Sequence, residues 1–416
     1  MKTQIERARA EKITPQCRSV AKKEGISPEI VASRIARGSV VIMSRGRCSV
    51  GIGEGLRTKV NVNIGTSSDR DDPQEEIKKG KIAEMYGADT ISDLSMGKDI
   101  PGTRKLIFQH TALPITTVPI YQTASEIGIK EMTGQDILRT IRAQAAEGIS
   151  SFVLHCVTHS VLGSYKKNKR ILGVVSKGGS ITSAYMLLNA CDNPFIENFD
   201  TVLSILKKYD IVLSLGNTMR SGCIHDARDK AQLAEIRENI RLAHRAHEAG
   251  VQVIIEGVGG HVRIDKIAHH VKYHKRLAKY PLFVAGPLPT DVAMGYDHIA
   301  GCTGASIASG AGADYLCYIT PAEHLGLPTP EHVREGLIAF RIAAHIGDSV
   351  KYGVSPADAA VSRSRADLNW EGQFCNALDP DKARTMAPQS GPCSMCGDFC
   401  AIKIMRKLSR QIIPQK

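Results

Sequence analysis

From Lys59 onward, short apolar runs alternate with longer stretches in which apolar and charged residues recur with helical periodicity. Eight runs have the length and composition of buried strands, and they cover residues 59–64, 89–94, 114–120, 150–156, 210–215, 251–256, 281–286 and 314–319. The helical interval 233–250 ends at Gly250, where a helix C-cap is expected. Eight repeated strand–helix units predict a closed (β/α)8 barrel of the α/β class. A ninth apolar run, 171–176, leaves the strand count open by one.

The pattern differs on either side of the predicted barrel. Residues 1–55 combine a helical pattern with a short apolar segment, VVIM, and predict a small N-terminal helical and extended region. The barrel is expected over residues 56–328. Residues 329–416 then read as helix after helix, interrupted by Gly391 and Pro392 just before three closely spaced cysteines. We therefore expect a C-terminal helical appendage that carries a cysteine loop.

Composition narrows the class of protein. The chain has 416 residues, of which 43% are hydrophobic and 23% charged, which is typical of a soluble globular protein. It has no run of about 20 apolar residues and no apolar core near its charged N-terminus, so we expect a cytoplasmic protein without a membrane partner. Eight of the eleven cysteines are scattered singly, which argues against disulfides.

The net charge of +12 favours an anionic partner. The basic residues are dispersed, and only 5% of the residues are aromatic, too few for a convincing base-stacking surface. We therefore expect a phosphate-bearing small molecule more than nucleic acid.

Polar and ionisable side chains follow every predicted strand. Barrel enzymes build their active sites at the carboxyl ends of the strands, so these side chains are expected to converge there. The candidates are Asn63, Ser92, Tyr121, His155, Asn217, Arg220, Glu256, His261, Asp291, Glu323 and His324. Such groups need solvent or partners, which indicates a binding site and not an ordinary packed core.

Glu256, His261 and His324 follow neighbouring strands, and two imidazoles with a carboxylate suit a divalent metal such as zinc. The alternative is that these histidines are structural, because a histidine at a strand end is more often a hydrogen-bonded structural residue than a metal ligand. The glycine-rich segments 177–180 and 256–261 could bring backbone N–H groups to a phosphate, although glycine is common in such turns for conformational reasons alone.

Cys393, Cys396 and Cys400 are the strongest chemical signal. They lie within eight residues, and no fourth cysteine is near. A structural zinc site normally has four closed ligands, whereas three thiolates fit a four-iron cluster with one iron left open for a small molecule. Zinc with a distant fourth ligand remains the alternative.

Several strings resemble the phosphomethylpyrimidine synthase family, among them TKVNVNIGTSS, GPLPTDVAMGYDHI, GADYLCYITPAEHLGLP and CSMCG. The likeness extends over residues 3–403. It implies a homodimeric barrel enzyme that uses a 4Fe-4S cluster, donated across the dimer, to cleave S-adenosylmethionine to a deoxyadenosyl radical. That radical attacks aminoimidazole ribotide in the barrel mouth. An electron donor such as flavodoxin or ferredoxin is also implied.

The resemblance implies roles for particular residues. The three cysteines would hold the cluster, and His261 with His324 would bind a second metal, zinc or another divalent ion. The residues expected around the ribotide are Asn63, Ser92, Tyr121, His155, Ser176, Arg220 and Glu256. The residues expected to act in catalysis are Glu256, Arg220, Asn217 and Tyr121.

The chain also departs from the thiamine branch of that family. Ser92 replaces a methionine, Asn217 replaces an aspartate, EGVGGH has an extra glycine, and the interval between Cys396 and Cys400 is one residue short. Losing a carboxylate at position 217 should change proton movement in the site. A paralogous branch converts the same ribotide to 5-hydroxybenzimidazole, a precursor of the cobalamin lower ligand.

We favour that activity, with phosphomethylpyrimidine synthesis for thiamine as the alternative. A non-enzymatic metal protein that binds RNA would explain the charge and the cysteines but not the polar strand ends.

Overall fold

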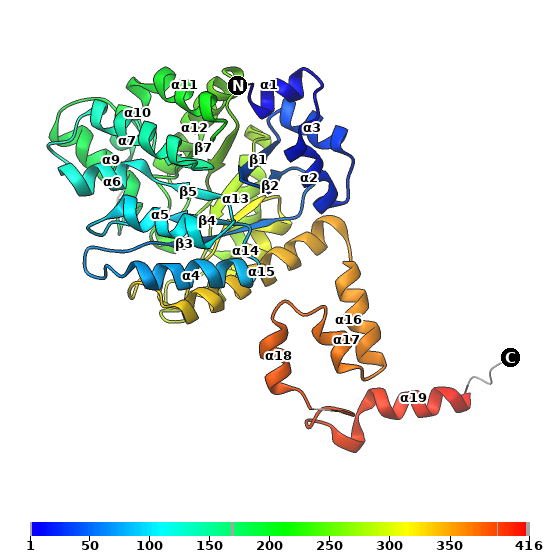
Figure 1. The fold of residues 1–416 in the computed structure, drawn as a ribbon. Coiled ribbons are helices and arrows are strands. Elements are labelled where there is room, and N and C mark those ends of the chain that lie inside the picture. Colours follow the sequence, from blue (N-terminus) through cyan, green and yellow to red (C-terminus); the bar gives the residue numbers. More distant parts are fainter. Residues whose placement is uncertain (1, 168–169, 389, 413–416) are drawn as a thin grey trace. The chain divides into compact units, whose positions relative to one another are not determined.

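The computed structural model describes residues 2–167, 170–388 and 390–412. Eight parallel strands close into a barrel in the order β10-β3-β4-β5-β6-β7-β8-β9 (Figure 1). They are β3 (Lys59–Ile64), β4 (Thr90–Asp93), β5 (Ile115–Thr117), β6 (Ser151–Leu154), β7 (Val212–Leu215), β8 (Val253–Glu256), β9 (Leu282–Ala285) and β10 (Tyr315–Cys317). The predicted (β/α)8 barrel is confirmed. Residues 171–176 form no strand, which resolves the open count.

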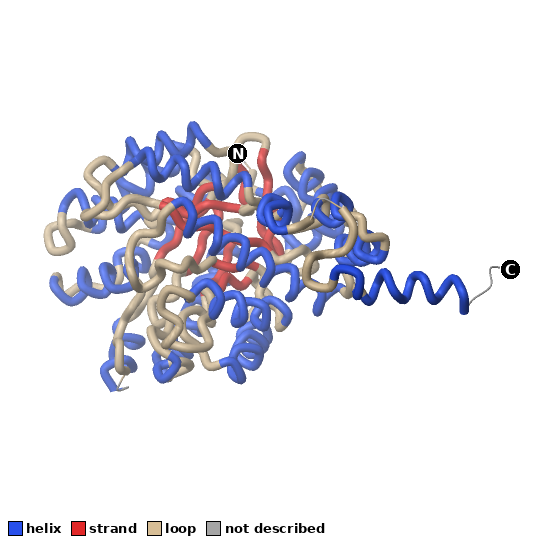
Figure 2. The backbone as a smooth tube through the Cα atoms, turned by 90° about the horizontal axis from the view of Figure 1, so that it is seen from below, coloured by secondary structure: helices blue, strands red, loops and turns tan. Residues whose placement is uncertain are grey.

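Helices surround the strands. In the view from below, the strands lie at the centre and the helices lie around them (Figure 2). The helices between β3 and β7 are α4 (Pro73–Met85), α5 (Ile100–His110), α6 (Pro119–Ile127), α7 (Gly134–Glu147), α8 (His159–Lys167), α9 (Lys177–Leu188), α10 (Pro194–Glu197) and α11 (Phe199–Tyr209). Those after β7 are η1 (Ile224–Asp226), α12 (Lys230–Glu248), α13 (Ile264–Leu277), α14 (Asp297–Gly310) and α15 (Pro330–Tyr352). Many begin at a Ser, Thr, Asp or Asn whose side chain accepts a backbone N–H, as Asp229 does for α12.

The N-terminal region closes one end of the barrel. Helices α1 (Gln4–Arg9), α2 (Pro15–Glu24) and α3 (Pro28–Ala36) precede an antiparallel hairpin of β1 (Val40–Arg45) and β2 (Cys48–Gly53). One face of the hairpin, including Val41 and Ile52, packs against Val212, Phe283 and Tyr315 near the first residues of three barrel strands. The hairpin therefore fills the end of the barrel opposite the carboxyl ends of the strands.

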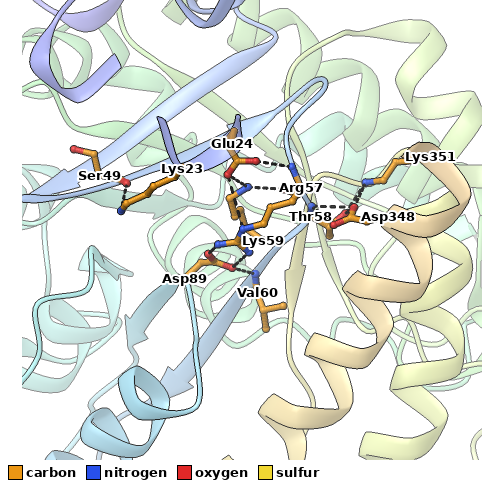
Figure 3. A network of polar contacts seen from close by, with 10 residues as sticks. All are labelled: Lys23, Glu24, Ser49, Arg57, Thr58, Lys59, Val60, Asp89, Asp348 and Lys351. Atoms are coloured by element: carbon orange, nitrogen blue, oxygen red, sulfur yellow. Dashed lines mark hydrogen bonds and ion pairs between the residues drawn. The ribbon is translucent and has the colours of Figure 1, made fainter. Parts of the chain in front are cut away.

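A buried ionic network joins this region to the barrel (Figure 3). Lys59, at the start of β3, is 1% exposed, and its Nζ lies 3.0 Å from Glu24 Oε1 of α2. Burial lowers the pKa of Lys59 to about 8. The neighbouring Thr58 N–H donates to Asp348 Oδ1 of α15 at 3.0 Å. Helix α2, before the barrel strands, and helix α15, after them, therefore both bond to the residues at the start of β3.

The chain divides into two compact units, residues 1–351 and 352–416. Helix α15 therefore belongs almost entirely to the barrel unit, although the sequence suggested that the C-terminal appendage begins at residue 329. Its Val333, Leu337 and Phe340 are fully buried in the same core as the strands. The difference arises because the apolar face of α15 recurs every three to four residues and covers the barrel.

The second unit is a small helical assembly. It contains α16 (Pro356–Ala366), α17 (Trp370–Phe374), α18 (Pro380–Met386), η2 (Gly397–Phe399) and α19 (Ala401–Ile412). Trp370 Nε1 donates to Gly391 O at 2.9 Å, which anchors the segment that leads to the cysteines. Across both units, no described helix combines the length and apolar character that a membrane span needs.

Candidate active site

A cavity of about 330 Å³ opens at the carboxyl ends of the barrel strands. All but two of the predicted barrel site residues line it, although they come from seven different strand ends. They are Asn63, Ser92, Tyr121, His155, Asn217, Arg220, Glu256, His261, Glu323 and His324. The exceptions are Asp291 and Ser176. The expectation that polar strand ends converge on one mouth is therefore met by the folded chain.

Ser176 lies behind His155 and does not line the cavity. It caps the N-terminus of α9, where its hydroxyl accepts the Gly179 N–H, and its Oγ lies 2.9 Å from His155 Nε2. Burial and the nearby Arg220 charge lower the pKa of His155 to about 3. The imidazole is therefore neutral near pH 7, and Ser176 holds its orientation.

Glu256 ends β8 and points into the cavity between two donors. Ser214 Oγ donates to its Oε1 at 3.0 Å, and the Asn217 N–H donates to its Oε2 at 3.3 Å. Burial raises the pKa of Glu256, while these hydrogen bonds and the charge of Arg220 oppose the rise. A carboxyl group with a raised pKa can exchange a proton closer to neutral pH than an exposed one.

Arg220 and Tyr121 occupy the same cavity. Arg220 Nη2 donates to Val175 O at 3.3 Å, which fixes the guanidinium beside the segment before α9. Burial raises the pKa of Tyr121 to about 12, so its hydroxyl stays protonated. The Lys177 ammonium lies 5.2 Å from the centre of the Tyr121 ring. Together these groups give the mouth positive charge and a neutral hydroxyl donor.

Cys317 lines the cavity but is not among the candidate residues taken from the sequence. Asn63 Nδ2 donates to its Sγ at 3.0 Å, and Asn63 Oδ1 in turn accepts from Asn61 Nδ2 at 2.8 Å. Burial raises the pKa of Cys317 to about 12, which keeps the thiol protonated. Strand alternation could have identified it, because Cys317 shares a face with Tyr315, whose hydroxyl bonds to Asn61 inside the barrel.

His261 and His324 face each other across the cavity. Their Nε2 atoms are 3.3 Å apart, and the Nδ1 atoms lie 2.6 Å from Asp291 Oδ1 and 3.6 Å from Asp297 Oδ2, respectively. Two nitrogens bound to a tetrahedral zinc at about 2.1 Å would be separated by about 3.4 Å. Carboxylates on the second ring nitrogens are the usual support for metal-binding histidines. The pair therefore fits a divalent metal.

The expected three-residue set is not assembled. Among the described residues, no three His, Cys, Asp or Glu side chains are close enough together to hold a metal ion. The Glu256 carboxylate instead accepts hydrogen bonds from the Ser214 hydroxyl and the Asn217 N–H. A metal at the two histidines would take its remaining ligands from water or a bound small molecule.

The cysteine loop precedes α19 in the second unit. Cys396 is exposed, Cys393 is half-buried and Cys400 is buried. A turn holds the loop, with the Gly397 N–H donating to Cys393 O at 3.1 Å and the Cys400 N–H to Gly397 O at 3.3 Å. Three thiols on one short loop are the donor type that an iron–sulfur cluster requires. Among the described residues the three thiols do not form a site for a single metal ion, and a four-iron cluster would need each thiolate to bind a different iron.

Comparisons with known proteins cover nearly the whole chain. Residues 3–407 match the model of the radical SAM ThiC family. A phosphomethylpyrimidine synthase of Dehalococcoides mccartyi strain BAV1 is 45% identical over 97% of this chain and 98% of its own. The phosphomethylpyrimidine synthases of Ignicoccus hospitalis and Thermus thermophilus are 44% and 42% identical, each over 97% of this chain and 96% of theirs.

Solved structures are more distant. A DAHP synthase from Thermotoga maritima covers 77% of each chain at 11% identity, with a TM-score of 0.44. The match over both the barrel and the cysteine loop, at identities far above 30%, decides the family. The chain belongs to the radical SAM ThiC family.

Proposed function

We propose that this protein is a phosphomethylpyrimidine synthase, a radical enzyme that converts aminoimidazole ribotide to hydroxymethylpyrimidine phosphate. The observation that carries the proposal is that relatives with this name match both the barrel mouth and the cysteine loop. This reverses the preference drawn from the sequence, which favoured hydroxybenzimidazole synthesis. Radical SAM family membership itself implies a 4Fe-4S cluster and S-adenosylmethionine.

The cavity offers suitable groups for a ribotide. Arg220 supplies positive charge for its phosphate, and Tyr121 supplies a protonated hydroxyl. Asn217 Nδ2 is buried and has no hydrogen-bond partner among the described residues, so it is free to donate to a bound ligand. Glu256, with its raised pKa, is the group best placed to take or return a proton.

Two further groups complete the proposed site. Cys393, Cys396 and Cys400 would hold the cluster, which supplies the electron for reductive cleavage of S-adenosylmethionine. His261 and His324 would hold zinc or another divalent metal, with open coordination positions for a small molecule. We also propose that the enzyme is a homodimer that receives electrons from a flavodoxin or ferredoxin.

The test is anaerobic turnover of the reconstituted, reduced protein with aminoimidazole ribotide and S-adenosylmethionine. The proposal expects deoxyadenosine together with a phosphorylated pyrimidine, identified by mass spectrometry. A fluorescent hydroxybenzimidazole as the main product would overturn the pyrimidine assignment while retaining the substrate. Absence of ribotide consumption would overturn both.

Hydroxybenzimidazole synthesis remains the second candidate because of two cavity residues. Asn217 lies beside Glu256, where the thiamine branch has an aspartate, and Ser92 lines the mouth in place of a methionine. An amide cannot accept a proton as a carboxylate can. If the amide diverts the reaction, Asn217→Asp should shift the product ratio toward the pyrimidine, whereas an enzyme that already forms the pyrimidine should keep its product.

A further inference from the structure

Arg170 is a buried arginine outside the cavity whose donors are fully engaged. Its side chain is 1% exposed. Nε and Nη2 donate to the Asp229 carboxylate at 2.7 and 2.9 Å in a bidentate pair. Nη2 also donates to Met219 O at 2.7 Å, and Nη1 donates to Gly173 O at 3.1 Å. One guanidinium therefore joins residues 170–173, the loop after β7 and the N-cap of α12.

Residues 170–176, here called the strap, form one wall of the cavity. Leu172 and Val175 line the cavity directly, and Ser176 at the end of the strap orients His155. The strap is also held by Asp226, whose carboxylate accepts the N–H groups of Ile171 and Leu172 at 2.9 and 3.0 Å. The strap thus has no regular secondary structure but is fixed by two carboxylates.

The loop after β7, residues 216–220, forms the adjoining wall and carries Asn217 and Arg220. Glu235 of α12 supports it from beneath by accepting the N–H groups of Thr218 and Met219 at 2.7 and 2.8 Å. Above that support, the loop meets the strap at two places. One is the bond from Arg220 to Val175 O, and the other is the Arg170 guanidinium.

We propose that Arg170 is a positioning residue for the ribotide, setting the spacing between Arg220 on the loop and the Ser176–His155 pair at the end of the strap. This inference rests on the proposed function. Arg170 does not line the cavity, so it acts only through the groups it holds. A lysine keeps the charge but cannot replace a bidentate, planar donor that reaches three acceptors at once. Small errors in the placement of substrate-binding groups are costly to turnover.

The experiment compares full-length wild type with Arg170→Lys and Arg170→Gln, all reconstituted without oxygen. Arg241→Gln serves as the matched control, because Arg241 also pairs with a carboxylate of α12 but is largely exposed. Affinity for aminoimidazole ribotide is measured by titration calorimetry without S-adenosylmethionine. KM, kcat and the ratio of deoxyadenosine to product are then measured in turnover.

The proposal expects both Arg170 variants to bind the ribotide roughly tenfold or more weakly and to release more deoxyadenosine per product. Their thermal unfolding should remain cooperative, and Arg241→Gln should resemble wild type. If both Arg170 variants bind the ribotide with the same affinity as wild type, this inference is overturned and the proposed function stays intact. Failure of wild type to bind the ribotide would overturn both.

A second variant separates a positioning role of Arg170 from a purely structural one. Asp229→Asn weakens the same pair from the other side while leaving Arg170 in place. If Asp229→Asn and Arg170→Lys both lose cooperative unfolding, Arg170 is a structural residue and the positioning role is refuted. If Asp229→Asn folds and weakens ribotide binding, the role is supported independently of the Arg170 substitutions.

Discussion

His261 and His324 lie 63 positions apart in the chain, yet their Nε2 atoms approach to 3.3 Å at the mouth of the barrel. Each ring is backed by an aspartate, Asp291 and Asp297. Two unprotonated imidazole nitrogens at this distance would repel each other unless a proton or a metal ion lay between them. The geometry therefore supports a shared divalent ion, which elemental analysis can test.

The first prediction concerns that metal. His261→Ala or His324→Ala should reduce the divalent metal bound per chain to background, measured by mass spectrometry of the elements after dialysis. Asp291→Asn should keep the ligands but weaken metal binding by about 10–100-fold. His159→Ala is the control, because His159 is half-exposed on α8 and pairs with Asp192. Unchanged metal in both histidine variants would rule out this site.

The second prediction concerns Glu256. Glu256→Gln preserves its size and can still accept from Ser214, but it cannot exchange a proton. We expect kcat to fall by about 10²–10⁴-fold with little change in ribotide affinity. Glu238→Gln, which removes a half-buried carboxylate of α12 that pairs with Arg241 outside the cavity, should leave both unchanged. A Glu256→Gln enzyme with wild-type kcat would show that proton transfer uses another group.

The third prediction concerns stability at acid pH. Burial lowers the pKa of His274 on α13 to about 3, and neither ring nitrogen has a partner among the described residues. The unfolded chain binds this proton near pH 6.5, so the folded state loses stability as pH falls from about 6.5 toward 3. Between pH 7 and pH 5 the loss is about 2 kcal/mol.

His274→Leu should remove that part of the pH dependence. We therefore expect the free energy of unfolding in urea to fall less between pH 7 and pH 5 in this variant than in wild type. His110→Ala, at an exposed position near the end of α5, should retain the wild-type slope. The assignment to His274 fails if the variant and the wild type lose equal stability over this interval.

The barrel could be predicted from the sequence because its strands are short, apolar and buried. Ile91, Leu154 and Ile255 are fully buried, so the eight runs stand out from the amphipathic helices. The run 171–176 was ambiguous because Leu172 and Val175 are apolar for a different reason, namely that they line the cavity wall. The sequence pattern assigned α15 to the C-terminal appendage, whereas Val333 and Phe340 of this helix are buried in the same core as the strands.

The site could be predicted as a set of residues but not as a geometry. Strand-end position was enough to gather Asn63, His155 and Glu256 into one cavity. It could not show that Ser176 bonds to His155 instead of lining the cavity, or that Glu256 bonds to Ser214 instead of joining the two histidines. Those partners depend on side-chain packing between strands, which no local pattern encodes.

The residues at the cavity mouth do not by themselves identify the product of the reaction. Asn217 and Ser92 were correctly located in the mouth, and they suggested altered chemistry. Relatives named as phosphomethylpyrimidine synthases nevertheless match the chain at 42–45% identity over nearly its full length. A change at two positions indicates where the reaction can differ, but the outcome of a radical rearrangement depends on all the groups around the intermediate.

The most direct test of the account is the rate of deoxyadenosine formation from S-adenosylmethionine by wild type and by Cys396→Ala, each reconstituted and reduced without oxygen. Cys375→Ala is the matched control, since Cys375 is an exposed cysteine of the same unit outside the loop. The account predicts cleavage by wild type and Cys375→Ala and none above background by Cys396→Ala. Undiminished cleavage by Cys396→Ala would contradict it.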